Sequence, residues 1–405
     1  MFTLRQYVRN SVWVIKLLYF FLYSAIAAWS SYFYVFLEDD RALTGTQIGL
    51  IAAVQQINNI IFLPLWGMVS DRYGKRKVFL MLIGISVVLL YGFMLNGSFW
   101  YYFLFMILFS ALHNPVGALI DAFAINKSKE KYINSSYGQM RLWASVGWAF
   151  SSLLTGYLIE STSLSIIFVV ASFFLLCTWL VTFFYVNKKR EIRSTQAPSF
   201  KTLKNLLFGN KQLFYFFLII MLFYILNSPT LNFINLYYKE IGASNTQIGY
   251  AFAVQALCEL PFMFFSTHII NKFGIRRVLF ATMVVASVRL MLYGFTTDPW
   301  VAISIGALHG ITLGLFIVSV IEYTNYIVPQ SQNSTGQTLM YTFLGVGMSV
   351  GNFLNGLWKD SFGLQYAMRI DSVLIIILLI AVYMVLFYRK GKQKIKMRAV
   401  RKKNV

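Results

Sequence analysis

Residues 46–55 read TQIGLIAAVQ and residues 246–255 read TQIGYAFAVQ, so one passage occurs twice at a spacing of 200 residues. Three residues downstream recur at the same spacing: Gly74, Arg76 and Val78 return as Gly274, Arg276 and Val278. Self-similarity at a fixed distance is the mark of a duplicated structural unit. Basic residues follow each copy at the same end, so the two units are predicted to be parallel repeats.

The composition is that of an integral membrane protein. Of the 405 residues, 58% are hydrophobic and only 12% are charged, whereas soluble domains are about one quarter charged. The apolar residues gather in runs of about 20, the length that a helix needs to cross the roughly 30 Å hydrocarbon core of a bilayer. The alternating ten-residue strands of a membrane barrel are absent from the sequence. We therefore predict an all-α membrane protein embedded in the lipid bilayer.

Twelve membrane-spanning helices are predicted, six in each repeat. They cover residues 17–36, 48–68, 78–94, 99–121, 138–159, 165–186, 213–238, 248–270, 278–295, 301–327, 335–358 and 368–387. The chain then divides into four parts: an N-terminal six-helix half (1–186), a cytoplasmic linker (187–212), a C-terminal six-helix half (213–388) and a basic cytoplasmic tail (389–405). An even number of spans places both termini on one side of the membrane.

The formal net charge of +21 raises the question of a nucleic-acid partner. However, 29 of the 35 lysines and arginines lie in the termini, the linker and the loops on one side of the predicted spans. Such an excess marks the cytoplasmic side of a membrane protein. The charge therefore indicates a multi-pass protein of the plasma membrane with both termini cytoplasmic, and no nucleic-acid partner is expected.

The loop between the second and third predicted spans carries the motif GMVSDRYGKRK at residues 67–77. Six of its residues are candidates for a conformational switch: Gly67, Asp71, Arg72, Gly74, Lys75 and Arg76. An acid and several bases beside glycine turns can hold neighbouring helices in one state through ion pairs and helix dipoles. The motif resembles the signature loop of the major facilitator superfamily, and NKFGIRR at 271–277 is similar to its second copy. The resemblance implies a transporter, usually monomeric, with two parallel six-helix repeats.

Several ionisable residues lie within predicted spans, where an unpaired charge costs several kcal/mol and is a functional candidate by default. At about 1.5 Å per residue, Glu259, Arg289 and His309 all fall near the middle of the membrane. Asp121 and Arg141 fall nearer the cytoplasmic ends of their spans. For that pair, interfacial pairing without a role in transport is the alternative.

The fifth span, YGQMRLWASVGWA at residues 137–149, resembles the superfamily branch that includes lactose permease and the phenylpropionate-type permeases. By this resemblance Arg141 binds the substrate and Trp148 stacks against a sugar ring. The DAF sequence that begins at Asp121 is similar to the branch's EAF. The resemblance therefore implies that Asp121 is the acidic partner of Arg141, in substrate binding and in proton coupling.

The second half resembles the same branch at three places: Glu259 in ELPFMFF, Arg289 in SVR and His309 in ALH. These residues are similar to the carboxylate, arginine and histidine of the branch's sugar and proton site. The resemblance implies that all three couple transport to protons and that Glu259 also contacts the substrate. Thr312 departs from the pattern, because lactose permease has its proton-coupling glutamate there. Coupling has therefore moved to another carboxylate or has been lost.

Uncharged polar residues complete the predicted cavity. Gln55 and Asn59 follow helical spacing in the second span, and Asn59 stands at the repeat position of Glu259. His113 ends a first copy of the Ala-Leu-His sequence that ends at His309. Polar side chains also join neighbouring membrane helices, and this alternative stays open for each of them.

The mechanism that follows is alternating access, in which two halves rock about one central site. The sequence contains no Walker-type phosphate loop, so a solute or ion gradient must supply the energy, and a proton is the expected coupling ion. We expect no enzymatic activity, cofactor or metal site. Uptake of a small polar solute such as a sugar or glycoside is favoured by Arg141 and Trp148. Uptake of an aromatic acid or nucleoside, favoured by Thr312, and drug efflux, favoured only by the abundance of aromatic residues, remain open.

Overall fold

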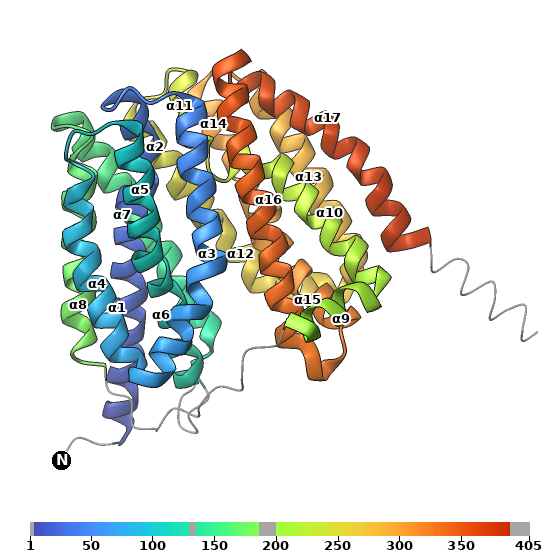
Figure 1. Ribbon diagram of the computed structural model, residues 1–405, viewed down its shortest axis with the longest axis horizontal. Helices are drawn as coiled ribbons and strands as arrows, with labels where there is room; N and C mark the ends of the chain where they lie inside the picture. Colours follow the sequence, from blue (N-terminus) through green and yellow to red (C-terminus); the bar gives the residue numbers. More distant parts are fainter. Residues whose placement is uncertain (1–3, 129–134, 186–199, 389–405) are drawn as a thin grey trace, which may run out of the picture.

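The structure, a computed structural model, describes residues 4–128, 135–185 and 200–388, which fold almost entirely as helices (Figure 1). The described part of the first half forms α1 (Leu4–Ser30), α2 (Phe33–Asp39), α3 (Gly45–Tyr73), α4 (Lys75–Gly92), α5 (Phe99–His113), α6 (Pro115–Ser128), α7 (Tyr137–Ser161) and α8 (Ile166–Thr182). No β-strand occurs among these described residues.

The remainder of the described chain forms the second half. Its helices are α9 (Phe200–Gly209), α10 (Lys211–Asn227), η1 (Ser228–Thr230), α11 (Ile234–Glu240), α12 (Asn245–Phe273), α13 (Ile275–Phe295), α14 (Pro299–Gly306), η2 (Gly310–Leu315), α15 (Phe316–Ile327), η3 (Gln330–Gln332), α16 (Asn333–Phe362), α17 (Leu364–Tyr383) and η4 (Met384–Tyr388). The predicted linker therefore contains a helix, α9, and α10 begins two residues before the predicted seventh span. Residues 187–199 of the linker and the predicted tail lie outside the described residues.

Every predicted span overlaps a helix, and the all-helical membrane fold is confirmed. In the described chain, nine helical segments are long and apolar enough to cross a membrane. The helices α4, α8 and α16, at the third, sixth and eleventh predicted spans, are not among the nine, and α8 has only 17 residues. Length and composition alone thus do not establish the full count of twelve.

The first, fourth, seventh and tenth predicted spans are each found as one membrane-spanning segment, and each contains a local interruption of its helix. Their interruptions lie at residues 31–32, 114, 228–233 and 307–315. Asn114 itself keeps helical dihedrals (φ −62°, ψ −33°). Pro115 accounts for the second interruption because a proline has no backbone N–H to donate to the preceding turn. In the tenth span the chain passes through a π-helical segment, η2, a rare form that is frequent at functional sites. Each half is therefore interrupted in its first and fourth spans.

The duplicated sequence begins the same helix twice. At the start of α3, the Thr44 hydroxyl accepts a hydrogen bond from the backbone N–H of Gln47, and the Gln47 side chain accepts one from the N–H of Thr44. Ser244 and Gln247 repeat both bonds at the start of α12. These are capping boxes, which satisfy backbone donors that a helix start leaves free. The repeated glutamine is thus structural.

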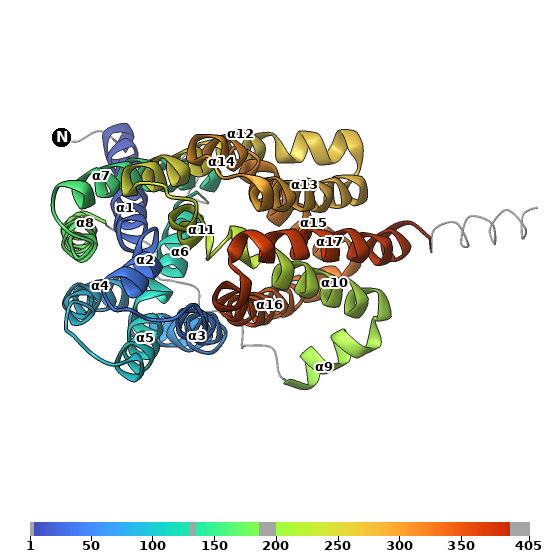
Figure 2. The ribbon, with the colours of Figure 1, turned by 90° about the horizontal axis from the view of Figure 1, so that it is seen from above.

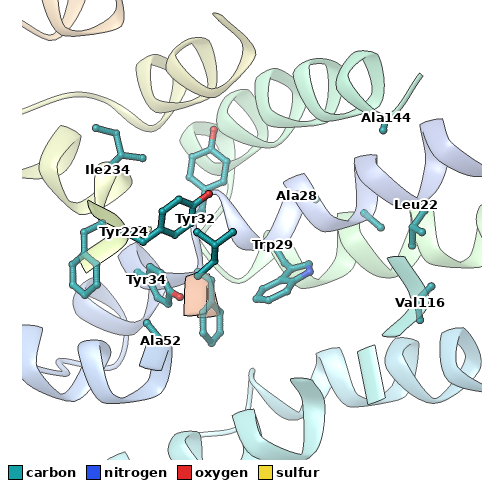
Figure 3. Packing of buried hydrophobic residues seen from close by; sticks show 14 of the residues in the cluster. Leu22, Ala28, Trp29, Tyr32, Tyr34, Ala52, Val116, Ala144, Tyr224 and Ile234 are labelled. Atoms are coloured by element: carbon teal, nitrogen blue, oxygen red, sulfur yellow. The ribbon is translucent and has the colours of Figure 1, made fainter. Parts of the chain in front are cut away.

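The two halves pack side by side along two pairs of helices, α3 with α16 and α7 with α12 (Figure 2). One buried hydrophobic cluster continues across the boundary, with Tyr32 and Tyr34 from the first half and Tyr224 from the second (Figure 3). At the end that carries α2 and α11, called here the upper end, these two short helices also touch (Figure 1). The start of α1 lies at the opposite, lower end.

Glycines let the paired helices approach to backbone contact near the upper end. A methyl group on Gly49 would lie 2.7 Å from the carbonyl oxygen of Asn352, and one on Gly249 would lie 2.6 Å from that of Ser152. Small residues allow this kind of approach in membrane helices. Gly156 and Gly356, which lie on the partner helices, are equally crowded by backbone atoms of the other half.

Candidate functional site

A cavity of about 740 Å³ lies between the two halves. Three of the predicted substrate-binding residues, Gln55, Asn59 and Trp148, line it. The lining is mostly aromatic and aliphatic, with several uncharged amides, as expected of a site for a small solute. The interrupted spans supply many of the lining residues: Tyr23, Trp29, Phe33, Tyr34, His113, Asn114, Asn232, Asn235 and Ile317.

The cavity is closed at the upper end and open toward the lower end. Among its lining residues, Trp29 and Asn235, near the upper end, are only 2% and 1% exposed. Tyr341, which is nearer the lower end of α16, is 53% exposed, and Pro64 in the lower part of α3 is exposed as well. A solute in this conformation could therefore reach the cavity from the lower end.

Polar contacts close the upper end, and two of them form a matched pair. Asp360 at the end of α16 accepts hydrogen bonds from the backbone N–H groups of Gly45 and Thr46 at the start of α3, both at 2.7 Å. Glu160 of α7, 200 positions earlier in the chain, accepts hydrogen bonds from the backbone N–H groups of Asn245 and Thr246 at the start of α12, at 2.7 and 3.3 Å. In each case a carboxylate of one half meets the positive end of a helix in the other half.

Two lysines reinforce this closure across the same boundary. Lys239 lies 2.9 Å from Asp39, and Lys359 pairs with Glu38. We call these two ion pairs, together with the Asp360 and Glu160 contacts, the upper seal. The sequence contained the signal for part of it, because the two carboxylates stand at matching positions of the repeats.

The first charged cluster is built around Asp121. The Nε atom of Arg141 lies 3.8 Å from Oδ1 of Asp121, which also accepts hydrogen bonds from the hydroxyls of Tyr19 at 2.7 Å and Tyr137 at 3.1 Å. The Arg141 guanidinium lies over the ring of Tyr23, 4.3 Å from its centroid. The structure thus brings the predicted pair together, and Tyr23 connects it to the cavity wall.

The second charged cluster joins α12, α13 and the tenth span. His309 Nε2 lies 3.0 Å from Glu259 Oε1, and its Nδ1 lies 2.9 Å from Nη1 of Arg289. The same Nη1 donates to the hydroxyl of Thr312 at 3.0 Å. Arg289 is completely buried, so these contacts take the place of water around its charge.

The contacts determine which nitrogen of His309 carries the proton in this arrangement. A guanidinium can only donate hydrogen bonds, so Nδ1 must accept from Arg289. The proton of a neutral ring then lies on Nε2 and is donated to Glu259. Thr312 cannot carry an acidic proton, but its hydroxyl oxygen accepts a hydrogen bond from the buried Arg289. The result is a chain of four groups with Glu259 at one end.

The structure does not gather all the predicted residues around the cavity. Asp121, Arg141, Glu259, Arg289 and His309 do not belong to its lining. The amides that do are partly engaged with one another, since Asn114 donates to Asn59 at 2.7 Å and Tyr34 donates to Gln55 at 3.4 Å.

Sequence reasoning missed several residues of the cavity wall, among them Tyr23, Trp29, Asn114, Asn232 and Asn235. The two asparagines of the seventh span were a usable signal, because polar residues are rare in such apolar segments. The aromatic residues carried no signal of this kind.

The predicted switch loop holds helices of the same half together in this conformation. Gly74 separates α3 from α4 with φ +96°, a left-handed value that favours glycine. Asp71 pairs with Lys75 at 3.6 Å, whereas Arg76 donates to the carbonyl oxygens of Thr182 and Phe183 at the end of α8. A cation at the carboxyl end of a helix is favourable.

The second copy of the loop keeps part of this arrangement. Gly274 has φ +82° between α12 and α13, and Arg276 donates to the carbonyl oxygen of Leu386 in η4. Each repeat therefore attaches its third span to its sixth by an arginine.

Comparisons with known proteins agree with this architecture. The chain is 27% identical over 357 residues to the maltose permease of Geobacillus stearothermophilus, covering 85% of this chain and 88% of that protein. It is 22% identical over 403 residues to the sucrose permease of Escherichia coli, covering 93% and 94%. A solved structure of a mutant of the nucleoside transporter NupG superposes with a TM-score of 0.83 at 16% identity, covering 93% of this chain and all of that one.

Residues 12–370 match the profile of the MFS_1 like family. The match spans most of both halves, and the duplicated loops, the helical halves and the interposed cavity all agree with it. The protein therefore belongs to the MFS_1-like family, and with it to the membrane transporters of the major facilitator superfamily.

Proposed function

We propose that the protein carries a sugar or glycoside into the cell together with a proton, by alternating access. The observation that carries this proposal is the cavity, whose wall combines Trp148 with uncharged amides such as Gln55 and Asn59. An aromatic face and amide groups suit a neutral polyhydroxylated ring, which has apolar faces and many hydroxyl groups. Relatives named as maltose and sucrose permeases support the same substrate class.

The lower end faces the cytoplasm in this proposal. The start of α1 and the basic segments 72–77 and 272–277, where α3 meets α4 and α12 meets α13, lie at that end, in accord with the positive-inside preference. The conformation described here is then inward-facing, with the upper seal shut toward the outside. Opening of the seal and closure of the lower end would present the same cavity to the external medium.

Proton coupling is assigned to Glu259, because its carboxylate is the partner of a histidine that is itself held by a buried arginine. When Glu259 is ionised, it accepts the His309 N–H and balances the charge of Arg289. When Glu259 is protonated, that balance is lost and the cluster must rearrange. A proton on Glu259 can thereby be linked to the position of α12, one of the four helices along which the halves pack. Asp121 and Arg141, through Tyr23, complete the substrate site on the other half.

The test is uptake of labelled maltose, sucrose and lactose by proteoliposomes, with and without an inward proton gradient. We expect the wild type to accumulate one of them only with the gradient, and the Glu259→Gln variant to lose accumulation. Glu322→Gln is the matched control, because Glu322 is an exposed carboxylate of the neighbouring α15, and it should retain accumulation. Sugar uptake that only equilibrates, regardless of the gradient, would contradict coupling and identify a facilitator. Failure to move any of the three would contradict the sugar assignment.

A further inference from the structure

Three side chains on the first-half wall of the cavity have polar atoms without hydrogen-bond partners. They are Trp29 and Ser30 at the end of α1 and His113 at the end of α5, and all three line the cavity. Within the part of the chain that the structure describes, the Nε1 of Trp29, the Oγ of Ser30 and both ring nitrogens of His113 have no partner. Buried polar groups are almost always hydrogen-bonded, so four such atoms on one wall need an explanation.

Packing fixes the two rings and leaves only their polar edges unsatisfied. The ring of His113 stacks on Phe109 with centroids 4.8 Å apart and an angle of 13° between the planes. Trp29 meets the same phenylalanine edge-on at 5.2 Å and the His113 ring at 5.8 Å. Figure 3 shows the indole of Trp29 projecting from α1. The rings are 2% and 3% exposed, so they cannot turn freely into water.

These three side chains lack hydrogen-bond partners, whereas the amide side chains that line the cavity have them. Asn59 accepts from Asn114, Asn232 donates to Asn352, and Asn235 donates to the carbonyl oxygen of Ser31. Those amides have protein partners. The indole, hydroxyl and imidazole do not, although all three residues belong to the cavity wall.

We propose that Trp29, Ser30 and His113 form a subsite that binds the hydroxyl groups of a neutral sugar. The indole can only donate, a neutral imidazole offers one donor and one acceptor, and a serine hydroxyl offers both. A hydroxyl group of a sugar also donates and accepts, so adjacent hydroxyls satisfy this mixed set. The three side chains carry no carboxylate or fixed cation that would select a charged solute. This subsite rests on the proposed sugar function and adds residues to it.

The test compares substitutions that keep each shape and remove the polar atom: Trp29→Phe, Ser30→Ala and His113→Phe. Binding of maltose, sucrose and lactose is measured by calorimetry on the protein in lipid nanodiscs, and thermal unfolding is measured without sugar. We expect each variant to bind the preferred sugar roughly fivefold to thirtyfold more weakly. The sugar-free protein should keep or raise its unfolding temperature, because an unsatisfied buried group is removed.

Trp66→Phe is the matched control, because the Nε1 of Trp66 already donates to the carbonyl oxygen of Ala111 at 2.8 Å and Trp66 does not line the cavity. It should lower the unfolding temperature and leave sugar affinity unchanged. Unaltered sugar affinity in all three wall variants would overturn the subsite while the sugar function stands. The subsite is also overturned if Trp29→Phe destabilises the sugar-free protein as much as Trp66→Phe. Absence of binding by the wild type to any of the three sugars would remove the proposed function, and the subsite with it.

Discussion

The upper seal and the middle of the membrane spans both belong to the duplicated halves. The two copies carry matching residues at the seal but different residues in the middle of the spans. At the seal, Glu160 and Asp360 stand 200 positions apart and make the same contact with opposite halves. In the middle of the spans, the matching repeat positions differ: Asn59 corresponds to Glu259, and Trp148 corresponds to Met348.

This difference indicates that the two regions have different roles in transport. Two halves that rock about one site need similar contacts on both sides of the rocking axis, so repeated contacts suit the movement. Binding one asymmetric solute and one proton needs different groups on the two walls. We infer that the repeated residues govern the conformational equilibrium, whereas the divergent residues select the cargo.

The largest effect is expected from breaking the close approach of the halves on both sides at once. The double variant Gly156→Trp and Gly356→Trp places a ring where even a methyl group would meet the backbone of the other half. The upper end then cannot shut, and transport should fall on the order of 100-fold. A cysteine at Gln55, in a Cys177→Ser and Cys258→Ser background, should become reactive toward an impermeant thiol reagent added outside. A double variant with normal transport would show that the seal does not need backbone contact.

The next effect concerns Trp148 and Met348, which occupy matching repeat positions and both line the cavity. If the centre has diverged for binding, Trp148→Leu should weaken sugar binding about tenfold, because a stacking face is lost. Met348→Leu conserves volume and should change affinity about twofold or less. Calorimetric titration of both variants with the transported sugar measures the difference. Equal losses would mean that the two walls bind the sugar alike.

A smaller and symmetric effect is expected from the two seal carboxylates. Glu160→Gln and Asp360→Asn each remove a charge from a helix start in the other half, which should shift the inward–outward equilibrium about two- to fivefold. Distances between spin labels across the upper end report the shift. Asp298→Asn is the control, since Asp298 caps α14 within its own half. Unequal shifts from the two seal variants would contradict the matched-pair interpretation.

The smallest effect is expected at the repeated loop arginines. Arg76 and Arg276 each hold the end of a distant helix of the same half. Substitution of either by glutamine should lower stability by about 1 kcal/mol and leave sugar affinity unchanged. Thermal unfolding in nanodiscs and a binding titration together check this. A change in affinity would indicate that the loop acts on the site directly.

The sequence predicted the positions of the spans because apolar length is a local property. It did not predict the interruptions, although Pro115 and Pro229 are local signals at those of the fourth and seventh spans. The interruptions of the first and tenth spans have no proline beside them. The capping boxes that begin α3 and α12 were not predicted either, although their glutamines, Gln47 and Gln247, belong to the repeated TQIG passage.

Within the candidate site, the cost of burying charge indicated that Arg141 and Arg289 need partners near them. It could not indicate that Tyr19 and Tyr137 share Asp121, or that Thr312 accepts from Arg289. Those contacts join residues of different helices and depend on how the helices pack. The same reason hid the unpartnered atoms of Trp29 and His113.

The central claim, that sugar and proton move together through this protein, is tested most directly by recording pH inside proteoliposomes when sugar is added outside. An entrapped pH-sensitive dye reports the lumen, with no proton gradient imposed at the start. We predict acidification of the lumen as the sugar enters with the wild type, and sugar-independent pH with Glu259→Gln. Sugar entry with the wild type at constant lumenal pH would contradict the account.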